Sequence, residues 1–274
     1  MVEVRQWRRE DSLRFVRAPG PDDDKYSRGV VALRTGSAEF PGAAVLSVEA
    51  AWRAGAGYVR YVGSARDAVL ARRPETVAAD DLGRTRADAW VLGSGTDAAT
   101  RTAEETAALR GILRGEIPVV VDAGALDLAP EATAPVVVTP HAGEFSRLRE
   151  RLGLETGADR VVEAVQTAQA LGSTLLLKGS RTLVASPDGV VIELPTAPGW
   201  LATAGSGDVL AGVLGAVIAA NPDAPLAPAA AAGAWLHARA ARIAAGMSDG
   251  PPGHPIVALD VAEALPSAIG DLLS

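Results

Sequence analysis

A glycine-rich turn followed directly by a carboxylate is the stretch of this sequence best suited to chemistry. "TAGSGDVLAG" places Gly205 and Gly207 before Asp208 and an apolar run. A turn of this kind at the start of a helix directs unpaired backbone N–H groups and the positive end of the helix dipole at one spot, which suits a phosphate. An acid beside that phosphate can act as a general base for a hydroxyl nucleophile, or it can simply cap the helix. The residues alone leave both interpretations open.

Two further stretches place polar residues directly after apolar runs. In "LLLKGSRT", Lys178 is followed by Gly179, Ser180, Arg181 and Thr182. A lysine beside free backbone amides can hold a nucleotide phosphate, although a lysine in such a place is more often only solvated. In "VVVTPHAGEFSRL", His141 projects from a turn after an apolar run, and Glu144 lies near the start of a helical pattern, where it can complement the dipole.

These residues must be positioned by the elements around them, and short apolar runs alternate with helical patterns along most of the chain. Strand-like runs at 29–36, 87–95, 117–126, 134–144 and 173–180 are nearly all apolar, as expected for strands buried on both faces. Helical patterns lie between them, including 41–57, 144–153 and 159–172, and one over 96–113 with Thr96 or Asp97 available as its cap. Asp188-Gly189 predicts a hairpin between two later strands, and the last third reads as mostly helical.

The pattern predicts an α/β fold with a mostly parallel central sheet and helices on both faces. No repeat or linker divides the chain, so we expect one domain over residues 1–274. Ligands of such sheets bind beyond the carboxyl ends of the strands, where Gly93, Gly95, Asp122, Thr139 to Glu144 and Lys178 to Thr182 fall.

The composition excludes several classes of protein. The formal net charge of −7 argues against nucleic-acid binding, and the absence of cysteine excludes disulfides and thiolate chemistry. The N-terminus has no apolar signal core, and the longest apolar stretch, Val209 to Ala220, is shorter than the roughly 20 residues that span a bilayer, so a cytoplasmic protein without a membrane anchor is expected. No histidine or carboxylate cluster has metal-ligand spacing, which predicts no dedicated metal site. A Mg²⁺ ion carried by a nucleotide would need only one or two carboxylates.

Taken in order, seven motifs resemble those of the nucleotide-dependent NAD(P)H-hydrate dehydratases of the ribokinase-like superfamily. They are "KYSRG…GSAEFPGAA", "GSG", "VVDAGAL", "TPHAGEFSRL", "LLLKGSRT", "GWLATAGSGDVLAGVLGAVIA" and "VALDVAEALPSAI", between about Lys25 and Ile269. The family's common T-G-G-T-G-D reads "TAGSGD" here, with Ala204 in place of a glycine, and its D-A-D-A-L reads "DAGAL".

The resemblance implies a ribokinase-like three-layer sandwich and an enzyme that repairs NADHX and NADPHX, the hydrated forms of reduced nicotinamide cofactors. Enzymes of this family use ADP or ATP, with Mg²⁺, to phosphorylate the hydroxyl of the S epimer and then eliminate it. The family's pattern implies that Ala43, Gly95, His141 and Asp208 contact the hydrated cofactor, with Asp208 as the base. It also implies that Lys178 to Thr182 and Gly207 hold the adenine nucleotide. A homotetramer, and a separate epimerase to convert the R form, are expected on the same ground.

Two other functions remain compatible with the residues. A ribokinase-like kinase of a small vitamin-precursor alcohol would use the same anion-binding turn and Asp208, although "TPHAGE" and "FPGAA" favour the dehydratase. A nucleotide-binding protein without turnover is the other alternative, and the retained Asp208 argues against it.

Overall fold

The computed structural model describes residues 2–247, 250 and 252–274. Within these residues ten strands form one sheet in the order β1-β10-β9-β8-β7-β6-β5-β2-β3-β4. All pairs are parallel except β8–β9 and β9–β10, so the predicted hairpin is confirmed. The strands are β1 Val4–Gln6, β2 Val30–Arg34, β3 Tyr58–Tyr61, β4 Val77–Ala78, β5 Ala89–Leu92, β6 Val119–Val121, β7 Val136–Val138, β8 Thr174–Leu177, β9 Leu183–Ala185 and β10 Val191–Glu193.

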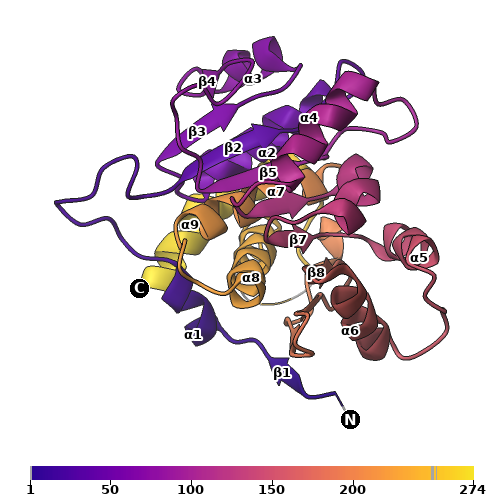
Figure 1. The fold of residues 1–274 in the computed structure, drawn as a ribbon. Helices are drawn as coiled ribbons and strands as arrows, with labels where there is room; N and C mark the ends of the chain where they lie inside the picture. The colour runs from indigo at the N-terminus through magenta and orange to yellow at the C-terminus, as the bar shows by residue number, and fades with distance from the viewer. Residues whose placement is uncertain (1, 248–249, 251) are drawn as a thin grey trace.

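Helices cover both faces of this sheet, as the sequence predicts (Figure 1). The α-helices are α1 Arg9–Ser12, α2 Pro41–Arg53, α3 Arg66–Arg72, α4 Ala103–Leu113, α5 Ala142–Arg151, α6 Arg160–Leu171, α7 Ser206–Ala219, α8 Leu226–Ala244 and α9 Ala258–Leu273. Short 3₁₀ segments are η1 Leu13–Phe15, η2 Ala123–Glu131 and η3 Gly199–Leu201.

The alternation of side chains along each strand builds two separate hydrophobic cores. Val91 and Val120 face the core made with α2, α7, α8 and α9. Their neighbours Leu92 and Val121 face the core made with α4, η2, α5 and α6. Because both faces are buried, the central strands β5, β6 and β7 carry apolar residues at every position, which is why short continuous apolar runs predict these strands.

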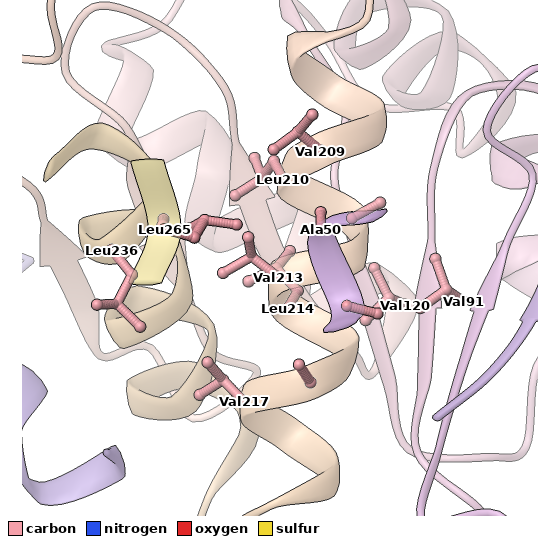
Figure 2. Close-up of a cluster of buried hydrophobic side chains, with 14 of the residues drawn as sticks. Ala50, Val91, Val120, Val209, Leu210, Val213, Leu214, Val217, Leu236 and Leu265 are labelled. Atoms are coloured by element: carbon pink, nitrogen blue, oxygen red, sulfur yellow. The ribbon is translucent and has the colours of Figure 1, made fainter. Parts of the chain in front are cut away.

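Helix α7 lies at the centre of the first core. Figure 2 shows its side chains between the strands that carry Val91 and Val120 and the helices that carry Leu236 and Leu265. Every residue of α7 from Val209 to Ala219 is buried. This packing explains the unbroken apolar run after Asp208 and holds the first turn of α7 in a fixed position.

Several short elements of the structure, α1 among them, were not predicted, and one predicted helix cap was wrong. Strands β1 and β4 have three and two residues, too few to leave a periodic pattern, and α3 is also short. The predicted cap of α4 is wrong: Thr102 caps this helix by accepting a hydrogen bond from Glu105 N–H. Asp97 instead accepts from Ala99 N–H, and the Thr96 hydroxyl donates to the Gly93 carbonyl, so both belong to the preceding turn.

Candidate active site

The order in which successive strands are added to the sheet reverses between the parallel neighbours β2 and β5. From β2 the chain continues through β3 to β4 on one side, whereas from β5 it continues through β6 and β7 to β8 on the other. The loops that follow β2 and β5 therefore leave the sheet at the point where the strand order reverses, which is the position where open α/β sheets bind ligands. A bond of 2.7 Å from Gly36 N–H to the Ser94 carbonyl joins the two loops at this point. The polar residues that follow the apolar strands thus lie along one edge.

A buried carboxylate, Asp122, is the centre of a polar cluster at this edge. It follows β6, and its Oδ1 accepts from Lys178 Nζ at 2.7 Å and from the Thr139 hydroxyl at 2.8 Å. Its Oδ2 accepts from the Ser94 hydroxyl at 3.0 Å. The partners come from the ends of β5, β7 and β8, so four adjacent strands contribute to one cluster. The cluster holds the Lys178 ammonium at the carboxyl edge rather than leaving it in solvent.

Asp208 lies in the first turn of α7, as predicted. Gly205 precedes this helix at φ +84°, a left-handed conformation that glycine adopts without strain. Burial raises the pKa of the Asp208 carboxyl to about 6, and the negative charge of Asp122 adds to the rise. The Ser94 hydroxyl and the Lys178 ammonium lower this pKa and oppose part of the rise. A carboxyl with this pKa can accept a proton near neutral pH, as a general base must.

The altered residue of the glycine turn fits the backbone. Ala123 is the one non-glycine residue with a positive φ among those that the structure describes, so Ala204 has an ordinary conformation. Gly207, by contrast, lies against charged groups: a Cβ there would be 3.5 Å from Lys178 Nζ and 3.9 Å from Asp122 Oδ2. The turn therefore tolerates Ala204, and Gly207 lies at the polar cluster.

His141 has a structural task in addition to its predicted role. It is the N-cap of α5, and its Nδ1 accepts from Gly143 N–H at 3.0 Å. Glu144 completes the capping box by accepting from His141 N–H at 2.8 Å. Glu144 Oε2 is also 3.8 Å from Lys178 Nζ, which links the α5 start to the Asp122 cluster.

A cavity of about 640 Å³ opens beside Lys178, which we name the Lys178 cavity. Its walls are partly polar and partly apolar, and its volume suits a nucleotide-sized ligand. The predicted nucleotide contacts that line it are Lys178, Gly179, Ser180, Thr182 and Gly207, and His141 lines it as well. Arg181 differs: its exposed guanidinium lies 3.5 Å from Glu193, and it is not among the lining residues.

The remaining predicted contacts, Ala43 and Gly95, meet where the loops after β2 and β5 leave the sheet. A Cβ on Gly95 would be 2.3 Å from the Cβ of Ala43, so these two residues touch. Gly95 has φ +68°, which favours glycine there. The structure thus brings Ala43 and Gly95 together after β2 and β5, on the other side of the Asp122 cluster from Lys178, which follows β8.

One buried residue of the site was not singled out from the sequence. His237 of α8 lines the Lys178 cavity, and burial lowers its pKa to about 4, so the ring is neutral at neutral pH. Its Nε2 has no hydrogen-bond partner among the described residues. The only sequence signal was a lone histidine within an alanine-rich helical pattern, and that signal does not show which face of α8 is buried.

The fold and the site together define an α/β protein of the mostly parallel, doubly covered type in which a glycine-opened helix presents an acid beside a lysine. Comparison with known proteins identifies the family of the chain. A model of the NAD(P)H-hydrate dehydratase family matches residues 31–249, and the chain belongs to this family.

Individual proteins that are similar to this chain belong to the same family. The chain is 37% identical over 262 residues to an ADP-dependent (S)-NAD(P)H-hydrate dehydratase of Neisseria meningitidis, covering 88% of this chain and 86% of that protein. It is 45% identical over 235 residues to a bifunctional NAD(P)H-hydrate repair enzyme of Mycobacterium leprae, covering 83% of this chain and 48% of the relative. The chain thus spans about half the length of the bifunctional relatives.

A solved structure supports the fold. The ADP/ATP-dependent NAD(P)H-hydrate dehydratase of Bacillus subtilis, co-crystallised with ATP/Mg²⁺, superposes with a TM-score of 0.82 at 26% identity over 98% of this chain and 99% of that one. The predicted ribokinase-like fold is confirmed.

Membrane-spanning helices and metal clusters are two further features to consider in the described residues. No helix among them has the length and apolar character to cross a membrane. The same part of the chain contains no group of three or more histidine, aspartate or glutamate side chains placed to hold a metal ion.

Proposed function

We propose that this protein dehydrates the S epimer of NADHX and NADPHX at the expense of an adenine nucleotide. The observation that carries the proposal is Asp208, a carboxyl of raised pKa at the start of α7, next to a lysine-lined cavity of nucleotide size. Membership of the family and the names of full-length relatives support the same reaction.

In this reaction Asp208 removes the proton from the hydroxyl of the hydrated nicotinamide ring. The hydroxyl oxygen attacks the terminal phosphorus of the nucleotide, which leaves one phosphate shorter. The C–O bond of the new phosphate ester then breaks, the oxygen departs within inorganic phosphate, and loss of a ring proton restores the reduced nicotinamide. Ala43, Gly95 and His141 would contact the substrate during these steps.

Lys178, Gly179, Ser180, Thr182 and Gly207 would hold the nucleotide in the Lys178 cavity. The Lys178 ammonium carries the charge that the phosphates need, and the bond to Asp122 keeps it directed at the edge of the sheet. Arg181 stays a prediction from the resemblance, since its side chain is directed toward Glu193. In the same cavity Ser206 and Gly207 supply first-turn backbone groups of α7, which suit an anion.

Mg²⁺ would enter with the nucleotide rather than occupy a protein cage. An ion carried by a nucleotide is coordinated mainly by phosphate oxygens and water, so it needs only one or two carboxylates from the protein. When bound, it would neutralise charge on the transferred phosphoryl group. We also expect the protein to act in the cytoplasm as a homotetramer beside a separate epimerase, and these three expectations stay predictions.

The decisive experiment follows the absorbance band of the reduced nicotinamide while purified protein meets S-NADHX with Mg²⁺ and either ADP or ATP. Return of the band only with a nucleotide is the expected result, and it also shows which nucleotide is used. No return with either one, in protein shown to be folded, contradicts the proposal and leaves the small-alcohol kinase as the reaction to screen.

The matched variants are Asp208→Asn in the first turn of α7 and Asp223→Asn in the turn that follows this helix, which make the same chemical change at the two places. We expect Asp208→Asn to lose at least 100-fold in kcat, in the range that general-base removal costs, roughly 10²–10⁴. Asp223 is exposed beyond the end of the helix, and its variant should keep the wild-type rate. Equal rates for Asp208→Asn and the wild type would remove Asp208 from the base role.

A further inference from the structure

A second cavity, of about 420 Å³, lies at the same edge of the sheet, and we name it the Arg147 cavity. Thr96, which follows Gly95, lines it on one side, and Glu144 and Arg147 of α5 line it on another. It thus adjoins Gly95 and His141, the predicted substrate contacts. None of its lining residues belongs to the Lys178 cavity, so the two hollows are separate.

Two arginines give this cavity its charge. Arg147 and Arg151 are four residues apart on α5, and both are exposed and line the cavity. Like charges at this spacing on a helix are mildly destabilising. Among the described residues, neither arginine forms an ion pair within 4.0 Å. The Glu131 carboxylate already accepts two hydrogen bonds from Arg110, at 2.8 and 2.9 Å, which lower its pKa, and the charge of Arg151 lowers this pKa further. Arg151 lies in the last turn of α5, where a cation complements the helix dipole, but no ion pair among the described residues accounts for Arg147.

The acids of the cavity do not cancel these charges. Asp127 accepts two hydrogen bonds from Arg101, at 2.7 and 3.1 Å. Glu144 is committed to the cap of α5 and faces Lys178 at 3.8 Å. Asp97 remains, at the exposed turn beside Thr96, where a carboxylate can accept hydrogen bonds from sugar hydroxyls.

The floor of the cavity is a strained turn directly after Asp122. Ala123 lines the cavity with φ +45°, which costs a residue with a Cβ about 1–2 kcal/mol. The next residue, Gly124, packs so closely that a Cβ would be 2.2 Å from the Thr96 carbonyl oxygen. Strain of this kind persists where the surroundings hold it, and it is concentrated at ligand sites.

The proposed substrate is a dinucleotide, and the contacts assigned so far account only for its reacting end. Its pyrophosphate, and the 2′-phosphate of NADPHX, still require cationic groups at the same edge. We propose that the Arg147 cavity binds the phosphate-bearing half of the substrate through Arg147 and Arg151. This inference rests on the proposed function, and it assigns the cavity to a phosphorylated nucleoside unit distinct from the nucleotide in the Lys178 cavity.

The test uses Arg147→Ala, Arg151→Ala and the double variant of the whole protein, with Arg114→Ala as a control. Arg114 is an exposed arginine at the end of α4 that does not line the cavity. We expect the double variant to raise KM for the hydrated cofactor roughly tenfold, as loss of charge-assisted hydrogen bonds implies. The values of kcat and of KM for ADP or ATP should stay within about twofold, and Arg151→Lys should restore part of the affinity.

A binding measurement separates the two proposals. NADPH has the same phosphates without the ring hydroxyl, and its Kd can be measured whether or not turnover occurs. Weaker NADPH binding in the double variant with an inactive wild type supports the cavity and contradicts the proposed reaction. An active wild type with unchanged KM and Kd in the double variant overturns the cavity assignment. An effect on NADPHX alone assigns the site to the 2′-phosphate, and an equal effect on NADHX assigns it to the pyrophosphate; both support it.

Discussion

Asp122 affects two functional groups at once, because it binds Lys178 and its charge raises the pKa of Asp208. We predict that Asp122→Asn lowers kcat/KM roughly tenfold or more, since a neutral amide holds the ammonium less well than a carboxylate. It should also move the acid limb of the pH–kcat/KM profile below its wild-type position near pH 6, because a negative charge beside Asp208 is lost.

Ser94→Ala provides the matched variant, with the opposite sign. The Ser94 hydroxyl lowers the pKa of Asp208, so its removal should shift the acid limb upward. Nonspecific loosening of the cluster would move both profiles in the same direction. Shifts of the same sign would therefore count against an electrostatic role for Asp122.

At the scale of elements, the contact between α2 and α7 positions both sides of the reacting centre, since α2 carries Ala43 and α7 carries Asp208. At Gly212 a Cβ would be 2.1 Å from the Ser47 carbonyl oxygen and 2.9 Å from the Ala50 Cβ. We predict that Gly212→Ala forces the two helices apart and lowers the free energy of unfolding by about 1–3 kcal/mol or more. Urea denaturation measures this loss, and kcat should fall with it.

Gly111→Ala is the control, because a Cβ at Gly111 in α4 meets no heavy atom within 4 Å. Alanine favours a helix over glycine by about 1 kcal/mol, so this variant should be at least as stable as the wild type. If Gly212→Ala matches it in stability, the two helices do not meet as closely as the structure shows.

The sequence predicted the elements better than the contacts between them. The buried strands and the helix after Gly205 leave strong apolar patterns, and these were confirmed. The cap of α4 could not be chosen, because Thr96, Asp97 and Thr102 are all good caps and only the path of the loop decides. Strand β1 depends on its partner β10, far away in the sequence, rather than on its own three residues.

The same limit applies to the site. Asp122 and Lys178 were both placed at strand ends, yet their bond spans 56 positions and exists only because β6, β7 and β8 are neighbours. The Arg147 cavity needs the loop after β5, the turn after β6 and the face of α5 together. Such juxtapositions depend on the topology of the sheet, which a periodic pattern does not encode residue by residue.

At the scale of the whole molecule, two buried groups affect stability in opposite directions. Asp208 has its pKa raised to about 6 from 3.8, so the unfolded chain loses this proton first and stability falls as pH rises between these values. His237 has its pKa lowered to about 4 from 6.5, so the unfolded chain gains this proton first and stability falls as pH decreases between these values. Between about pH 4 and 6 the two groups change the free energy of unfolding with opposite signs, each by about 1.4 kcal/mol per pH unit.

Asp208→Asn removes one of these two opposing contributions, so the free energy of unfolding of the variant should show the pH dependence that His237 causes. At neutral pH the variant should be more stable than the wild type by on the order of 3 kcal/mol, because a shift of about two pKa units no longer opposes folding. This advantage should shrink as the pH falls from about 6 and disappear below pH 3.8, once Asp208 is protonated in both states. Urea unfolding across this range measures the difference, and carboxylates with lowered pKa values, such as Asp188, affect both proteins alike. Parallel stability curves for the variant and the wild type would show that Asp208 titrates equally in the folded and unfolded states, and would contradict a buried base that disfavours folding at neutral pH.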